Sequence, residues 1–106
     1  MAKYLLEASY APEGLKGLRA EGGSSRVASV TQATEAAGGK LEAFYFAFGE
    51  HDVYAIVDYP DNVTAAGAAL AIGATGAVKV KTVVLLTAAE VDAAVKLPSS
   101  YRPPKG

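Results

Sequence analysis

One turn of this chain gathers its only histidine with two carboxylates, in the stretch Gly49-Glu50-His51-Asp52. An imidazole titrates near neutrality and a carboxylate can fix its tautomer, so His51 could act as a general base or a metal ligand, with Glu50 or Asp52 orienting it. Because hairpin loops are usually exposed, the favoured interpretation is that His51 is a solvated loop residue. We expect Asp52 to accept backbone N–H bonds that shape the loop, and Gly49 to supply a positive φ angle.

A second group of candidates lies on the strands around this turn. Glu7 is the favoured catalytic or binding residue, since it falls in the middle of a strand on a face that otherwise carries aromatic residues. The predicted ligand-binding residues on that face are Glu7, Phe44, Phe46, Tyr54 and Lys81. For Lys81 a solvated strand edge is an equal alternative, and tyrosines in strands are more often packing residues with a wet tip.

Composition narrows the classes of function. The net charge is −1, so no strong field exists to attract nucleic acid, and no cysteine is present for disulfides, thiolate catalysis or zinc. One histidine per chain cannot build a multi-histidine metal site within a subunit, although two copies could across a symmetric interface. We therefore expect no metal and no cofactor. The strand-like pattern begins at Lys3, which leaves no room for a signal peptide and predicts a cytoplasmic protein.

Apolar residues make up 51% of the chain, and their spacing predicts the order of elements. Period-two and period-3.6 patterns, with their breakers and caps, predict strand 3–10, a helix to 37 interrupted at 22–25, strands 41–48 and 53–59, helix 63–75, strand 78–86 and a short helix to 96. Asp61 or Asn62 should cap the helix at 63, and Thr87 with Glu90 forms a capping box. Residues 1–97 are then one domain, and residues 98–106 an irregular proline-rich tail.

This βαββαβ order is ferredoxin-like: an α+β fold whose antiparallel four-stranded sheet carries two helices on one face. Strict alternation would place Ala43 in the core and all three phenylalanines on the opposite, uncovered face. That face is too apolar for water, which predicts a dimer with a cavity between its two sheets, a dimeric α+β barrel. The alternative is a dry dimer interface whose polar groups lie at the rim.

The helix predicted at 63–75 has no charged residue and is apolar on every side. Such a helix should be buried all round, against the sheet and against another subunit. It is too short and too rich in alanine for a membrane span. We therefore expect the chain to assemble with itself, as a homodimer or a larger homo-oligomer, and not to interact with a membrane.

Several segments together resemble the GYD-domain proteins: Tyr4-Leu5-Leu6, residues 10–14, residues 38–45, Gly49 to Val53, residues 58–62, and Lys79 through Thr87 with Glu90. The chain departs from the family pattern at His51, where tyrosine is usual, at residues 22–25, and at Ala77, where asparagine is common. The resemblance implies a small bacterial protein of the dimeric α+β barrel superfamily, in a family without an established biochemical function. Members of that superfamily include cofactor-free monooxygenases, lactone isomerases and haem-binding enzymes, but kinship of fold does not transfer chemistry.

Two functions from different classes follow. In the first, a dimer holds a small apolar or aromatic molecule between its sheets, and Glu7, Tyr54 and His51 orient it or move a proton. In the second, the domain is a non-catalytic assembly or accessory protein whose apolar sheet face and alanine-rich helix are interfaces. The sequence leaves open whether the chain is an enzyme.

Overall fold

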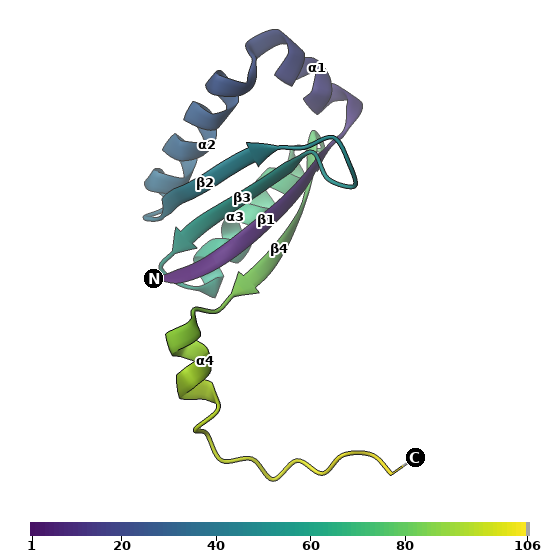
Figure 1. The fold of residues 1–106 in the computed structure, drawn as a ribbon. Coiled ribbons are helices and arrows are strands. Elements are labelled where there is room, and N and C mark those ends of the chain that lie inside the picture. Colours follow the sequence, from purple (N-terminus) through teal and green to yellow (C-terminus); the bar gives the residue numbers. More distant parts are fainter. Residues whose placement is uncertain (106) are drawn as a thin grey trace.

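A four-stranded antiparallel sheet with helices packed on one face forms the body of the protein, in a computed structural model that describes residues 1–105 (Figure 1). Its elements are β1 (Ala2–Tyr10), α1 (Pro12–Glu21), α2 (Gly23–Ala36), β2 (Lys40–Phe46), β3 (Val53–Tyr59), α3 (Asn62–Ala74), β4 (Val78–Leu85) and α4 (Ala88–Ala94). The strand order is β2-β3-β1-β4, so β1 and β3 are central. The predicted ferredoxin-like α+β fold is confirmed.

Local signals in the sequence set most of the boundaries. Pro12 opens α1 in the position where a missing N–H costs nothing, and Gly22, at φ 84°, separates α1 from α2. The side chain of Asp61 accepts the backbone N–H at the third position of α3, at 2.8 Å. Thr87 and Glu90 form the reciprocal capping box at the start of α4. The predicted interruption and both caps are confirmed.

The core lies between the sheet and its helices. One cluster of buried residues joins Tyr4 and Val57 to Tyr59 and to Ala65 of α3, and a second consists of Ala8, Val53 and Ala55. The second cluster has only small side chains. Its neighbours are partly buried residues of the strands, so the packing near the start of β3 is more open than around Val57.

A β-bulge in β2 decides which residues share a face. Leu41 pairs with Val57 but Ala43 pairs with Ile56, so one extra residue sits between them and the alternation of β2 reverses. Phe44 consequently lies opposite Ala55 and packs against the core. Phe46, two residues further along β2, lies on the same face opposite Val53 and packs against Gly23 of α2.

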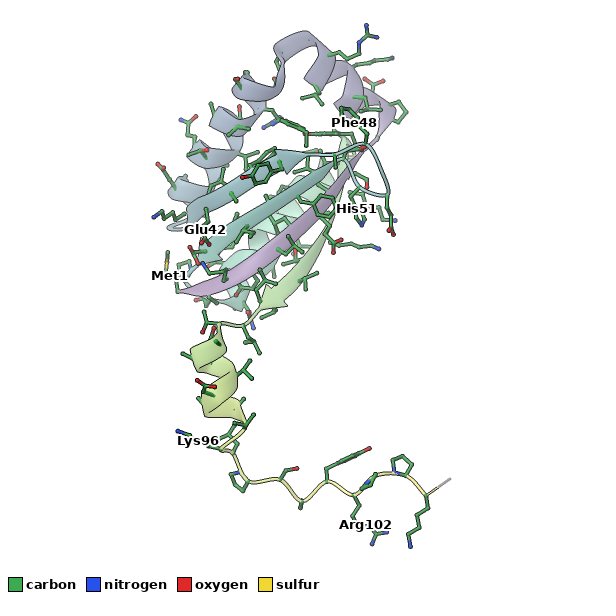
Figure 2. The ribbon with its side chains drawn as sticks, viewed as in Figure 1. Met1, Glu42, Phe48, His51, Lys96 and Arg102 are labelled. Atoms are coloured by element: carbon green, nitrogen blue, oxygen red, sulfur yellow. The ribbon has the colours of Figure 1, made fainter. Side chains whose placement is uncertain are left out.

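The expected positions of three residues are therefore wrong. Phe44 and Phe46 face the helices instead of the uncovered face, and Ala43 takes a place on the uncovered face instead of in the core. Phe48 lies beyond the end of β2 with its side chain in solvent (Figure 2). Period-two alternation cannot foresee this change, because a bulge adds a residue without leaving a distinctive residue type.

The uncovered face of the sheet, as the registers place it, has three cross-strand rows that span all four strands, and Ser9 of β1 pairs with Lys79 of β4 beyond them. The first row is Tyr45, Tyr54, Glu7 and Lys81; the second is Ala43, Ile56, Leu5 and Val83; the third is Lys40, Asp58, Lys3 and Leu85. A polar row and a charged row thus flank an apolar row, and no phenylalanine belongs to the face.

Two helices expose apolar surface. In α3, Ala65 is buried against the sheet, whereas Val63 and Leu70 on its outer side are 81% and 74% exposed, so burial of that side against another subunit stays a prediction. The α4 segment extends away from the sheet (Figure 1), and Val91 and Val95 are exposed along it. No helix within residues 1–105 is long and apolar enough to cross a membrane.

Candidate functional site

The loop between β2 and β3 folds back against β1 through the backbone and side chain of Asp52. The N–H of Asp52 donates to the carbonyl of Ala8, and its carbonyl accepts the N–H of Ala47, each at 2.8 Å. Its carboxylate accepts the backbone N–H of Tyr10, also at 2.8 Å. The structural role predicted for Asp52 is confirmed. Gly49 does not have the expected positive φ angle.

These bonds place His51 on the sheet, and its side chain is nearly buried. His51 is 8% exposed, so the interpretation of a solvated loop residue is wrong. Its Nε2 lies 3.3 Å from Oε2 of Glu7, and its Nδ1 lies 3.1 Å from Oγ of Ser9. The ring meets that of Tyr54 edge to face, with 5.8 Å between centroids. Figure 2 shows His51 at the end of the sheet where the loop turns back.

The chemistry of the three groups determines which atom donates and which accepts in each of these contacts. An ionised Glu7 can only accept, so Nε2 of a neutral His51 carries the hydrogen and Nδ1 is left as an acceptor. The hydroxyl of Ser9 then donates to Nδ1. If the imidazole takes up a second proton, the carboxylate of Glu7 faces the resulting cation. The Glu7–His51–Ser9 chain can therefore accept a proton at the sheet surface and stabilise the charge that this creates.

The surroundings differ at the two ends of the uncovered face. At the far end, Lys3 bonds to Glu42 and, at 3.0 Å, to Oδ1 of Asp58. The hydrogen bonds that Lys3 donates to Glu42 and then to Asp58 raise the pKa of Lys3 above its ordinary value. The cation and both carboxylates of this network therefore have partners within it. The His51 end has the contrasting feature of a half-buried carboxylate, that of Glu7, in contact with a nearly buried imidazole.

Comparison with known families agrees with the architecture. The model of the GYD domain matches residues 4–95, which contain β1 from Tyr4 onward, β2, β3, β4 and the whole Glu7–His51–Ser9 chain. The chain belongs to the GYD domain family. No curated protein and no solved structure matched the chain.

Within this GYD domain the predicted site residues separate into two groups. Glu7, Tyr54 and Lys81 lie in one cross-strand row of the uncovered face, and His51 joins them from the loop. Phe44 and Phe46 lie on the other side of the sheet, so they cannot line a site with Glu7.

Two further placements complete the group. Lys81 pairs with Glu7 across β1 and β4, yet the salt bridges of residues 1–105 join the Glu7 carboxylate to His51 and not to Lys81. Glu50, next to His51 in the loop, is exposed, and the carboxylate that orients the imidazole is Glu7. The role considered for Glu50 is wrong.

Ser9 is the residue of the GYD domain's candidate site that the sequence did not single out. It lies two residues beyond Glu7 and therefore on the same face of β1. That spacing was a usable signal, but only the return of the loop to β1 brings an imidazole between the two side chains. In the part of the chain that the structure describes, no three histidine or acidic side chains are grouped to hold a metal ion.

Proposed function

We propose that the protein binds a small apolar or aromatic molecule on the uncovered face of its sheet, between two copies of the chain. Glu7, Tyr54 and His51 orient that molecule or move one of its protons. The observation that carries the proposal is the Glu7–His51–Ser9 chain, in which a nearly buried imidazole contacts a carboxylate and a hydroxyl.

The energetic argument begins with the cost of this arrangement. Removing a carboxylate and an imidazole from water is unfavourable unless both find partners, and an apolar pair would be as stable at the same position. Here the loop is already held by the backbone bonds of Asp52, so the sheet does not need His51 for its register. A titratable pair at a prepared position is typical of binding and catalytic sites.

In a proton transfer at this position, Ser9 and His51 would carry the proton and Glu7 would stabilise the charge. The hydroxyl of Ser9 gives its proton to Nδ1 of His51 and takes one from an acidic O–H or C–H group of the bound molecule. The imidazolium then faces the carboxylate of Glu7, which stabilises its charge until the proton returns to the molecule or to water.

The apolar row beside the site supplies the reason for a second copy. Leu5, Ile56 and Val83 lie in the middle of the uncovered face, and Val83 is 40% exposed. Packing two such faces together would remove these side chains from water, at about 25 cal/mol per Å² of apolar surface. It would also enclose the polar row between the sheets and raise the strength of its electrostatic interactions.

The test measures bound ligand and subunit number together. Native mass spectrometry of the purified protein should show a dimer or larger oligomer with a small molecule attached. Glu7→Gln and His51→Ala should both lose the small molecule while keeping the subunit number. Glu50→Gln is the matched control, since it removes the same charge from an exposed neighbour of His51 and should keep the ligand.

The measurement can also contradict the proposal. Ligand retention in Glu7→Gln, or equal loss in Glu50→Gln, would show that the Glu7–His51–Ser9 chain does not bind the molecule. A strictly monomeric protein would remove the second copy from the proposal.

A second candidate function, an assembly module without a ligand, is favoured by a separate observation. Leu70 on the outer side of α3 is 74% exposed, and Val95 at the end of α4 is 76% exposed. If assembly through these helices is the function, Leu70→Glu should dissociate the oligomer and Val83→Glu should not. If the uncovered face is the interface, Val83→Glu should dissociate it instead. Size-exclusion chromatography with light scattering distinguishes the two outcomes.

A further inference from the structure

A cleft of about 290 Å³ lies on the opposite side of the sheet from His51, between the strands and the two helices α2 and α3. Its floor includes Ala8 and Ala55 of the central strands, and its walls include Val30 of α2, Phe44 of β2 and Ile72 of α3. Leu6 and Val53 of the same strands also line the cleft, and Ala8 and Ala55 are the shortest side chains of its floor. Side chains this short leave the space between the sheet and the helices unfilled.

The volume is at the lower end of what small-molecule sites in proteins have. Interiors of folded proteins are otherwise close-packed, with few voids larger than a water molecule. Water is a poor occupant of the part of the cleft lined by Ala8, Ala55, Phe44 and Ile72, because these side chains offer it no hydrogen bonds. An apolar body the size of one ring or a short branched chain fits the lining better.

The polar part of the lining has one sign of charge. Arg26 of α2 contributes a guanidinium, Tyr10 and Thr75 contribute hydroxyls, and none of the residues among 1–105 that line the cleft is acidic. The hydroxyl of Thr75 is already bonded to the carbonyl of Ile72 at 2.7 Å. Burial raises the pKa of the Tyr10 phenol, and the positive charge of Arg26 opposes that effect.

Arg26 is available to a ligand. Its one acidic contact is Glu21, with 3.7 Å between Nη1 and Oε1, and both side chains are more than a third exposed. Ion pairs of this kind contribute little to stability. A guanidinium beside an apolar cavity matches a carboxylate, because its planar donors can form two parallel hydrogen bonds to the two oxygens.

We propose that this cleft is a binding site for a small monocarboxylate with an aromatic or branched aliphatic body, whose carboxylate is bound by Arg26. A single cation in the lining selects a singly charged head group over a phosphate or a dicarboxylate. The body of the ligand lies on Ala8 and Ala55 and contacts Phe44 and Ile72. This site is separate from the Glu7–His51–Ser9 chain, since the two lie on opposite faces of β1.

The test uses 3-phenylpropionate and its neutral amide as probes of the full-length protein. Titration followed by amide NMR should show saturable binding of the acid, with shifts at Ala8, Ala55 and Ile72. The amide should bind at least about tenfold more weakly, as expected for loss of a charge-assisted hydrogen bond. Arg26→Gln should reduce the affinity for the acid to that for the amide and leave binding of the amide unchanged.

Two further variants keep the result unambiguous. Arg19→Gln removes the same charge from an exposed position of α1 and should not change either affinity. Val30→Phe adds a ring where the ligand body would lie and should abolish binding of both probes. The proposal is overturned if the acid does not bind saturably, if the acid and the amide bind equally well, or if Arg19→Gln and Arg26→Gln weaken the acid to the same extent.

Discussion

Two glycines of α1, three residues apart, should respond in opposite directions to the same substitution. A Cβ built on Gly14 would lie 2.3 Å from the carbonyl oxygen of Ala77 and 2.9 Å from Cδ1 of Tyr10. A Cβ built on Gly17 would meet nothing within 4 Å. Alanine favours a helix over glycine by up to about 1 kcal/mol at either position, so a comparison of the two variants largely isolates the steric cost at Gly14.

The magnitude follows from the contact with Ala77. Relieving it requires a movement of about 1 Å between α1 and the start of β4, and overpacking of this kind costs about 1–3 kcal/mol. The same carbonyl accepts the N–H of Ala11 at 2.9 Å, and losing that bond costs about 1 kcal/mol more. Gly14→Ala should therefore be less stable than Gly17→Ala by about 2–4 kcal/mol.

Urea unfolding and thermal melting of the wild type and both variants test this value. For a domain of this size about 1 kcal/mol corresponds to 4–8 °C, so the melting temperatures of the two variants should differ by roughly 10 °C or more. Gly17→Ala should melt at or above the wild-type temperature. If Gly14→Ala is as stable as Gly17→Ala, the packing of α1 against the start of β4 is not as described, and the reasoning fails.

Two other perturbations test the core and the helix cap. The hydroxyl of Tyr4, a residue that is 1% exposed, donates to Oδ1 of Asn62 at 2.6 Å, so Tyr4→Phe should lower the free energy of unfolding in urea by about 1 kcal/mol. Tyr45 is 71% exposed, and Tyr45→Phe should leave that free energy unchanged. Equal losses in the two variants would disprove the role of the bond. The hydrogen bond from the backbone N–H of Thr64, in the first turn of α3, lowers the pKa of Asp61. The ionised carboxylate therefore stabilises the folded state fully above the unfolded pKa, and this stabilisation is lost as the pH falls through the lower folded pKa. Stability should thus fall below about pH 4 less steeply in Asp61→Asn than in the wild type, as measured by urea unfolding at pH 6 and pH 3. Asp92→Asn, at an exposed position of α4, should keep the wild-type slope, and an unchanged slope in Asp61→Asn would contradict the capping argument.

β1 is common to both candidate sites. Glu7 and Ser9 face the uncovered side of the sheet, and Ala8 and Tyr10 face the cleft under the helices. The carboxylate of Asp52 accepts the N–H of Tyr10, so the loop that carries His51 is bonded to the strand that carries the cleft's phenol. Occupation of either site can be followed from the other by the amide signals of β1.

The order of the elements, their caps and the GYD resemblance were available from the sequence, because they depend on residues that are close together in the chain. Asp61 and Thr87 act on N–H groups three residues away, and the hairpin is bounded by runs that alternate locally. The choice of Glu7 as a candidate rested on the same alternation, which holds throughout β1 and β3.

The tertiary structure alone decided the surroundings of that candidate. His51 is nearly buried because Asp52 bonds to residues of β1 more than forty positions earlier, and no local pattern encodes such a return. The bulge before Ala43 exchanges the two faces of β2 from that residue onward, and Phe44 therefore lies in the cleft instead of at the expected site. The chemistry of the turn was legible in its residue types, but its position on the sheet depends on hydrogen bonds and a strand register that form only when distant segments pair.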